Sequence, residues 1–339
     1  SKGKITNANG ENFGYGDVVK EAALLEVPEN VKLKEPKDFT IIGTNAINVD
    51  IDKIITGKPL FGLDYKADNM IIASVLRPPA YGNTLVNFDD SKAKAVNGVV
   101  DVIKFGDKVA VLANSTWAAI KGKKALSANW KLNNPESTKN HDEILTKILD
   151  GKKVNTRRED GNVKKAFSKA DKVIERTYHS PFLPHNCLEP MNFYANVTAD
   201  KVHLVGPIQT PQWTVNRVAQ LLDRKSETIH CEMTRMGGGF GRRLYGDFAL
   251  EAAEISNIAK QPIKVVFSRE DDMTAGTYRP AIKYRIKASI KDDKVTGYHL
   301  KEAAINGNMY GLIPNFFPAG CIPNYKVETG NYKSNITTG

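Results

Sequence analysis

A glycine-rich stretch, MGGGFGRRLYGDF at residues 236–248, is the segment of the sequence most suited to binding a ligand. It combines charged side chains with glycines, which leave the backbone accessible. Its residues of interest are four glycines, one phenylalanine and two arginines: Gly237, Gly238, Gly239, Phe240, Gly241, Arg242 and Arg243. Glycines allow positive φ and let a ligand approach backbone amides directly. A helix that follows adds the positive end of its dipole, which favours an anion or an oxo group. The arginines supply planar donors suited to phosphate.

Two familiar phosphate-binding patterns do not fit this glycine loop, residues 237–241. A P-loop needs Lys-Ser/Thr after its last glycine, where this chain has Arg242 and Arg243. The dinucleotide pattern GxGxxG is also missed, because the run from Gly237 is GGGFGR. The alternative left open is a tight turn that binds no ligand. In that case the glycines are needed only for the backbone conformation, and the arginines pair with Asp247 or Glu251.

Four polar residues elsewhere are further candidates for the same site. Gln209 in GPIQTPQW offers a neutral amide, and its alternative role is a strand-end amide bonded to backbone. His185 and Glu189 in PHNCLEPM suggest acid–base chemistry, although a lone histidine is more often structural. Arg279 in TYRPA either serves the site or lies on the surface at the start of a strand.

Apolar spacing predicts the elements that position these residues. Leu244, Phe248, Ala252, Ile255 and Ala259 predict a helix with one apolar face that starts within or just after the glycine loop. Short β-branched runs predict strands, namely IIASVLRPP, VVDVIKF, KVAVLANS, VIERTYHS, NFYANVTAD, KVHLVGPIQT, SETIHCEMTRM, IKVVFSRED, AIKYRIKASI and VTGYHLKEAAING.

The intervening segments complete a mixed α/β pattern. DDSKAKAV and STWAAIKGKKALSANW predict helices between the early strands, and this alternation indicates a compact α/β domain. Residues 13–26 also have helical spacing and are followed by a linker broken by prolines. Residues 131–165 are polar and lysine-rich, which predicts a connection that wraps the outside.

Composition narrows the function classes. The 339 residues are 41% hydrophobic and 25% charged, which is typical of a globular chain with two core-bearing domains. The net charge of +10 fits an anionic ligand or partner, but the basic residues are dispersed, which argues against nucleic acid. Three widely spaced cysteines indicate neither a disulfide framework nor a zinc site. No apolar run reaches membrane-span length, and the polar ends suggest a piece of a longer protein.

The order of motifs resembles a known family. MGGGFGRR, followed by a helix, VVFSREDDM and YRPA, is similar to the molybdenum-binding large subunit of the xanthine dehydrogenase and aldehyde oxidase family, in particular its isoquinoline 1-oxidoreductase beta-subunit type. Upstream, TGKPLFGLDYKADNMIIASVLRPPAYG, AVNGVVDVI, VAVLANSTWAAIKGKKAL and PFLPHNCLEPMN extend the resemblance from about residue 13 to the end.

The resemblance implies a molybdenum ion held by the dithiolene of a pyranopterin, often extended to a cytosine dinucleotide in bacterial members, with no protein metal ligand. It assigns to Gln209 and to backbone amides of the glycine loop the contact with the metal's apical oxo ligand, with Phe240 and Gly241 closest. Such neutral donors stabilise an oxo group without adding charge. Arg242 and Arg243 are expected to face the pterin or phosphate groups, or a neighbouring segment.

The departures from the family pattern limit the expected activity. Purine-oxidising relatives carry a carboxylate where this chain has Leu244, which argues against a purine-like substrate. The family's catalytic glutamate, near the far carboxyl terminus, has no counterpart here, so this chain alone is expected to be inactive. Electrons are expected to leave through a separate small iron–sulfur subunit, because the chain lacks a four-cysteine pattern. The compartment, cytoplasm or periplasm, stays open.

The predicted fold is therefore α+β. It comprises an N-terminal helix and linker at 1–39, a hammerhead-like α/β domain at 40–150 and the first part of a molybdopterin-binding α+β domain at 151–339. With the remaining carboxyl-terminal part, the enzyme would hydroxylate an aromatic N-heterocycle or an aldehyde, with water as the oxygen source. The alternatives are a non-catalytic module that binds phosphate, another anion or a protein partner, and a plain scaffold domain.

Overall fold

The computed structural model describes residues 3–133, 135–151, 154–307 and 318–339. The chain divides into two compact units, Ser1–Gly57 and Lys58–Gly339. No helix in the described part of the chain is both long and apolar enough to cross a membrane.

The first unit contains only short elements: β1 (Lys4–Thr6), β2 (Asn12–Gly14), η1 (Tyr15–Asp17), α1 (Val19–Ala22), η2 (Pro36–Asp38) and α2 (Ile51–Ile55). None of its described residues is buried. The helix predicted over 13–26 is therefore wrong in extent, because only α1 forms. A short helix needs an apolar surface to pack against, and Leu25 stays exposed.

A seven-stranded mixed sheet in the second unit leads into the glycine loop. The strand order is β13-β12-β11-β14-β3-β6-β5, and only the pairs β12–β13 and β3–β14 are parallel. The strands are β3 (Ile71–Leu76), β5 (Val99–Phe105), β6 (Lys108–Ala113), β11 (Asn192–Val197), β12 (Val202–Gly206), β13 (Ile229–Met233) and β14 (Ile263–Val266). The sheet thus joins strands from both sides of the predicted domain boundary at residue 150, and that boundary stays a prediction.

Helices pack on this sheet according to the alternation of its side chains. Ala73 and Val265 belong to the main core together with residues of α7 (Pro211–Leu222) and α8 (Asp247–Ala259). Ile72 and Val266, one position along, pack instead with α4 (Thr116–Ala125). Because successive side chains in a strand point to opposite faces, α4 covers the face opposite α7 and α8.

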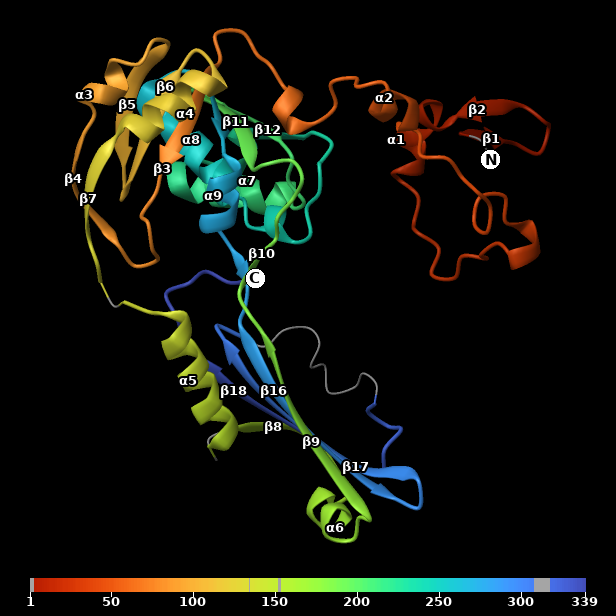
Figure 1. Cartoon of the computed structure of the whole chain (residues 1–339). Coiled ribbons are helices and arrows are strands. Elements are labelled where there is room, and N and C mark those ends of the chain that lie inside the picture. The colour runs from red at the N-terminus through yellow and green to blue at the C-terminus, as the bar shows by residue number, and fades with distance from the viewer. Residues whose placement is uncertain (1–2, 134, 152–153, 308–317) are drawn as a thin grey trace. The chain divides into compact units, whose positions relative to one another are not determined.

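The second large sheet has five strands, in the order β8-β18-β17-β16-β9. The strands are β8 (Asn155–Asp160), β9 (Lys172–Ser180), β16 (Ile282–Lys291), β17 (Lys294–Ile305) and β18 (Asn324–Tyr332). Helix α5 (Thr138–Asp150) lies along this sheet, and α6 (Val163–Ser168) lies at its far end (Figure 1). The remaining elements are η3 (Gly62–Asp64), β4 (Thr84–Asp89), α3 (Ser91–Lys94), β7 (Ser127–Lys131), β10 (Leu183–Pro184), η4 (Ser226–Thr228), η5 (Arg242–Leu244), α9 (Arg269–Thr274) and β15 (Tyr278–Arg279).

The structure corrects three predicted segments. The polar connection predicted at 131–165 is wrong, because α5, β8 and α6 lie there. Leu145 and Leu149 of α5 are fully buried, so a narrow apolar stripe on a polar helix sufficed. The helix predicted through residue 130 ends at Ala125, since β7 pairs with β4. The strand predicted through Asp271 ends at Val266, because α9 follows with a Ser268 cap.

Glu302 in β17 is a buried carboxyl group with an unusual protonation state. Its side chain is fully buried, and neither carboxyl oxygen has a hydrogen-bond partner among the described residues. Burial raises the pKa of Glu302 to about 8, although the charge of Arg157 acts in the opposite direction. The folded chain therefore holds this carboxyl group protonated at neutral pH.

We expect Glu302→Gln to stabilise the chain at pH 7 by about 1–3 kcal/mol. Between the ordinary glutamate pKa and about 8, the folded state keeps a proton that the unfolded state has lost. The free energy of unfolding of the parent therefore falls as pH rises through this window. Glutamine does not titrate, so the variant does not lose stability in this way. Urea unfolding at several pH values measures it, and parallel pH profiles for parent and variant would contradict the expectation.

Candidate functional site

The glycine loop follows the edge strand β13 and leads through η5 into α8. Its backbone requires glycine for two different reasons. Gly241 has a φ of +89°, in the left-handed region that side chains disfavour. Gly239 leaves no room, since a Cβ atom there would lie 2.8 Å from Oε1 of Gln209. The loop is therefore shaped both by its own turn and by close contact with Gln209.

Gln209 lies against the loop, and its amide is bonded to backbone, which is the alternative role left open from the sequence. Its contact with a cofactor ligand stays a prediction. The N–H of Gly241 donates to Oε1 of Gln209 at 3.2 Å. Two further bonds fix this segment against η5: the Gln209 N–H donates to the carbonyl of Arg243 at 3.1 Å, and Thr210 Oγ1 donates to the carbonyl of Leu244 at 2.8 Å. Because the carbonyl end of the Gln209 amide is used inside the protein, its NH₂ end is the part suited to a ligand.

Backbone donors of the loop remain open. Within the described part of the chain, the N–H groups of Gly238, Gly239 and Phe240 have no hydrogen-bond partner. Gly238 and Phe240 have positive φ values of +98° and +49°, and the Phe240 side chain is 63% exposed. Successive N–H groups in such a turn form a concavity that suits an anion or an oxo group. This donor set fits a ligand with an electron-rich oxygen.

The Phe240 carbonyl is held from two sides. His185 Nδ1 donates to it at 2.8 Å, and Arg279 Nη2 donates to it at 2.8 Å. Burial lowers the pKa of His185, and the charge of Arg279 lowers it further, although the bond to the Phe240 carbonyl acts in the opposite direction. The lowered pKa favours the neutral imidazole at pH 7. Its second nitrogen, Nε2, is buried without a partner among the described residues. The structure thus brings His185 and Arg279 to the loop, where both fix a peptide group.

Both loop arginines point into the protein. Arg242 makes a bidentate pair with Asp247 at 2.5 and 2.8 Å, one of the pairings left open from the sequence. The Arg243 side chain is 0% exposed and donates to the carbonyls of Gly238 and Glu189 at 2.8 Å. The predicted cofactor role of these arginines stays a prediction. Their contacts are with protein groups that support the loop.

Glu189, a candidate from the sequence, has supporting contacts that the sequence did not indicate. Its carboxylate accepts from the Gly237 N–H at 2.8 Å, from the Leu63 N–H at 3.0 Å and from Asn192 Nδ2 at 3.0 Å. It also pairs with Arg243 at 3.2 Å. The only signal was its place near His185 in PHNCLEPM. Its acid–base role stays a prediction. Its bond with Gly237 holds the loop, and its bonds with Leu63 and Asn192 join that loop to two other segments.

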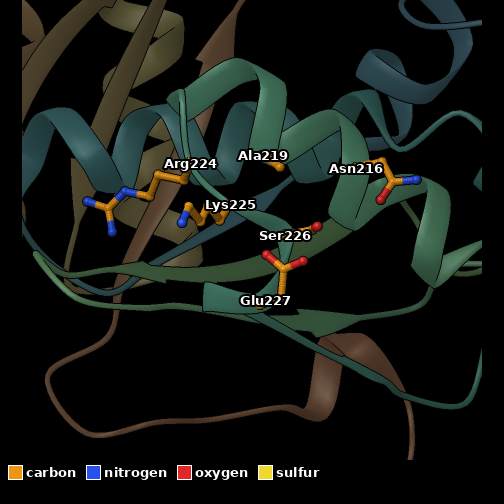
Figure 2. Close-up of a pocket in the computed structure, with 6 residues that line it drawn as sticks. All are labelled: Asn216, Ala219, Arg224, Lys225, Ser226 and Glu227. Carbon is orange, nitrogen blue, oxygen red and sulfur yellow. The ribbon is translucent and has the colours of Figure 1, made fainter.

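Two hollows lie away from the loop. A cavity of about 940 Å³ is bordered by Tyr81, Tyr278 and Asp247, among others. Figure 2 shows a shallower hollow at the end of α7, in which Asn216 and Arg224 extend in opposite directions. Arg224 there donates to the carbonyl of Ala199. None of the predicted site residues lines either hollow, so the glycine loop remains the candidate site.

Comparison with known proteins supports the predicted resemblance. A family model described as a molybdopterin cofactor-binding domain matches residues 147–337, more than half of the chain. Membrane-bound aldehyde dehydrogenase [pyrroloquinoline-quinone] of Gluconacetobacter polyoxogenes is 27% identical over 88% of this chain and 41% of its own length. Isoquinoline 1-oxidoreductase subunit beta of Brevundimonas diminuta is 26% identical over 85% of this chain and 38% of its own length.

A solved structure extends the likeness to the fold. Quinoline 2-oxidoreductase from Pseudomonas putida 86 superimposes with a TM-score of 0.68 at 15% identity, covering 87% of this chain and 45% of that one. This likeness confirms the predicted mixed α/β fold. The chain spans less than half the length of each of these relatives. It belongs to the molybdopterin cofactor-binding domain family.

Proposed function

We propose that this chain is the cofactor-binding part of a molybdenum hydroxylase that oxidises an aromatic N-heterocycle or an aldehyde. The observation that carries the proposal is the contact of Gln209 with a glycine loop. Neighbouring N–H groups of this loop have no hydrogen-bond partner among the described residues. Two relatives carry names with these substrate classes, an isoquinoline and an aldehyde. When bound, a molybdenum–pyranopterin group supplies two-electron oxidation with water as the oxygen source.

The chain's own residues divide into donors and supports. We assign the donor role toward the cofactor's oxo group to the Gln209 NH₂ group and to the open N–H groups of Gly238, Gly239 and Phe240. Neutral donors suit this task because they add no charge at the redox centre. Arg242 pairs with Asp247 and Arg243 pairs with Glu189, so both arginines support the loop, and their contact with the pterin or phosphate groups stays a prediction.

The finer assignments are proposals of the same kind. We propose a hammerhead-like α/β domain at 40–150 between an N-terminal segment, 1–39, and the cofactor domain at 151–339. A cytosine dinucleotide form of the cofactor and a separate iron–sulfur subunit complete the proposed enzyme. Its catalytic glutamate would lie in further sequence of the same subunit, consistent with the partial coverage of the relatives.

Molybdenum and released pterin per polypeptide test the function, measured on the intact subunit purified with its partners. We expect near-stoichiometric metal and a fluorescent pterin. Folded protein without molybdenum, from a host that makes the cofactor, would contradict the proposal. A released quinone would instead match the cofactor in the name of the aldehyde dehydrogenase relative. Stabilisation by phosphate alone would favour the anion-binding module.

A further inference from the structure

Strands β12 and β13 place two histidines and a glutamate on one face of the seven-stranded sheet. In their parallel register His203 pairs with His230, and Val205 pairs with Glu232. The alternate positions, such as Leu204 and Cys231, face the main core. Because side chains alternate along a strand, His203, His230 and Glu232 project from the opposite face.

The three donor groups of this cluster converge. Nε2 of His203 lies 2.6 Å from Oε1 of Glu232, and Nε2 of His230 lies 3.4 Å from the same oxygen. The two imidazole rings stack with centroids 5.7 Å apart. One ligand atom from each residue lies within 4.8 Å of the other two. The side chains are reachable from solvent, at 33%, 72% and 53% exposed.

Two imidazole nitrogens and one carboxylate oxygen form a donor set that Zn²⁺ uses, with water in the remaining position. Ligand atoms about 2.0–2.2 Å from a tetrahedral Zn²⁺ lie roughly 3.3–3.6 Å from one another. The separation of His230 and Glu232 already meets this spacing. The hydrogen bond between His203 and Glu232, at 2.6 Å, has to open for an ion to enter.

The five-stranded sheet contains a matched arrangement that cannot bind a metal in the same way. In the parallel pair β17–β18, His299 pairs with Lys326, and His299 bonds to Glu328 at 2.8 Å. Lys326 stands where the first cluster has His230, and its Nζ lies 3.3 Å from Glu328. An ammonium group has no lone pair to donate and repels a cation. The chain thus carries both the cluster and its control.

We propose that His203, His230 and Glu232 form a surface site for a divalent transition metal, with Zn²⁺ as the ion. A bound ion would cross-link the edge strand β13 to β12. Gly237 follows the end of β13 by four residues, so the ion would fasten the strand that leads into the glycine loop. The site is separate from the molybdenum site and does not depend on it.

Calorimetric titration of the full chain with Zn²⁺ tests the site. We expect binding at the cluster, and we expect His230→Lys, which copies the arrangement of β17–β18, to weaken it by at least about tenfold. Because His230 is mostly exposed, this variant should fold normally. His299→Ala is the matched control and should leave the affinity within about twofold, since that histidine faces a lysine.

The opposite substitution makes the test sharper. Lys326→His supplies the second imidazole beside His299 and Glu328, so it should add one bound Zn²⁺ per chain. A rise of the Tm with Zn²⁺ in the parent but not in His230→Lys gives an independent readout. Equal affinity in the parent and His230→Lys would overturn the proposal, as would a parent chain that binds no Zn²⁺.

Discussion

Replacing Gly241 by valine is expected to abolish molybdenum loading while the chain still folds. Gly241 has a φ of +89°, which a β-branched residue does not tolerate. An added Cβ would make only ordinary contacts, the nearest with the His185 ring at 3.6 Å. Strain of about 1–3 kcal/mol would instead turn the peptide, taking the Gly241 N–H from Gln209 and the Phe240 carbonyl from His185.

Molybdenum per polypeptide and the Tm, measured together on the intact subunit, separate loading from folding. We expect metal content below about a tenth of the parent value, since misplaced donors lose both geometry and charge complementarity. Gly320→Val is the matched control, because Gly320 has a φ of +79° and a Cβ added there would have no atom within 4 Å. It should destabilise similarly and keep its molybdenum. Normal loading in Gly241→Val would remove the loop from the site.

The sequence predicted those parts of the fold that local patterns determine. Val99–Phe105 and the helix after the loop follow from β-branching and apolar spacing, and both form. Helix α7 has no counterpart among the predicted elements, although Pro211 at its start and buried Val215 and Val218 are signals that could have found it. Helix α5 was not predicted, because its polar residues outnumber its buried leucines and the segment has the composition of a connection.

The site was predictable in part from the family resemblance. The resemblance assigns Gln209 and the glycine loop to the same ligand, and the bond from the Gly241 N–H to Gln209 places the two side by side. Their contact with a cofactor ligand stays a prediction. The pairing of Arg242 with Asp247, five residues away, was one alternative from the sequence. The direction of Arg243 could not be predicted, because it depends on Glu189, 54 residues away along the chain. A charged side chain at a loop has the same sequence signature whether it faces a ligand or a buried carboxylate.

Replacing Glu189 by alanine is expected to destabilise the second unit by about 3–5 kcal/mol, a larger stability effect than that of Glu302→Gln. The carboxylate is the only anion paired with Arg243 among the described residues, and that guanidinium has no access to solvent. Its loss also leaves the N–H groups of Gly237 and Leu63 without an acceptor. Glu175→Ala, in an exposed pair with Lys287, is the control and should cost no more than about 0.5 kcal/mol.

Urea unfolding of Glu189→Ala, Arg243→Met and the double variant identifies the source of this loss. If the unpaired buried charge dominates, the double variant should be more stable than Glu189→Ala, because removing both partners is far less costly than removing one. If the double variant is no more stable, the orphaned amides of Gly237 and Leu63 carry the cost. A loss below about 1 kcal/mol in Glu189→Ala would contradict the buried brace itself. In that case the loop would be held by its own turn and by its contacts with Gln209.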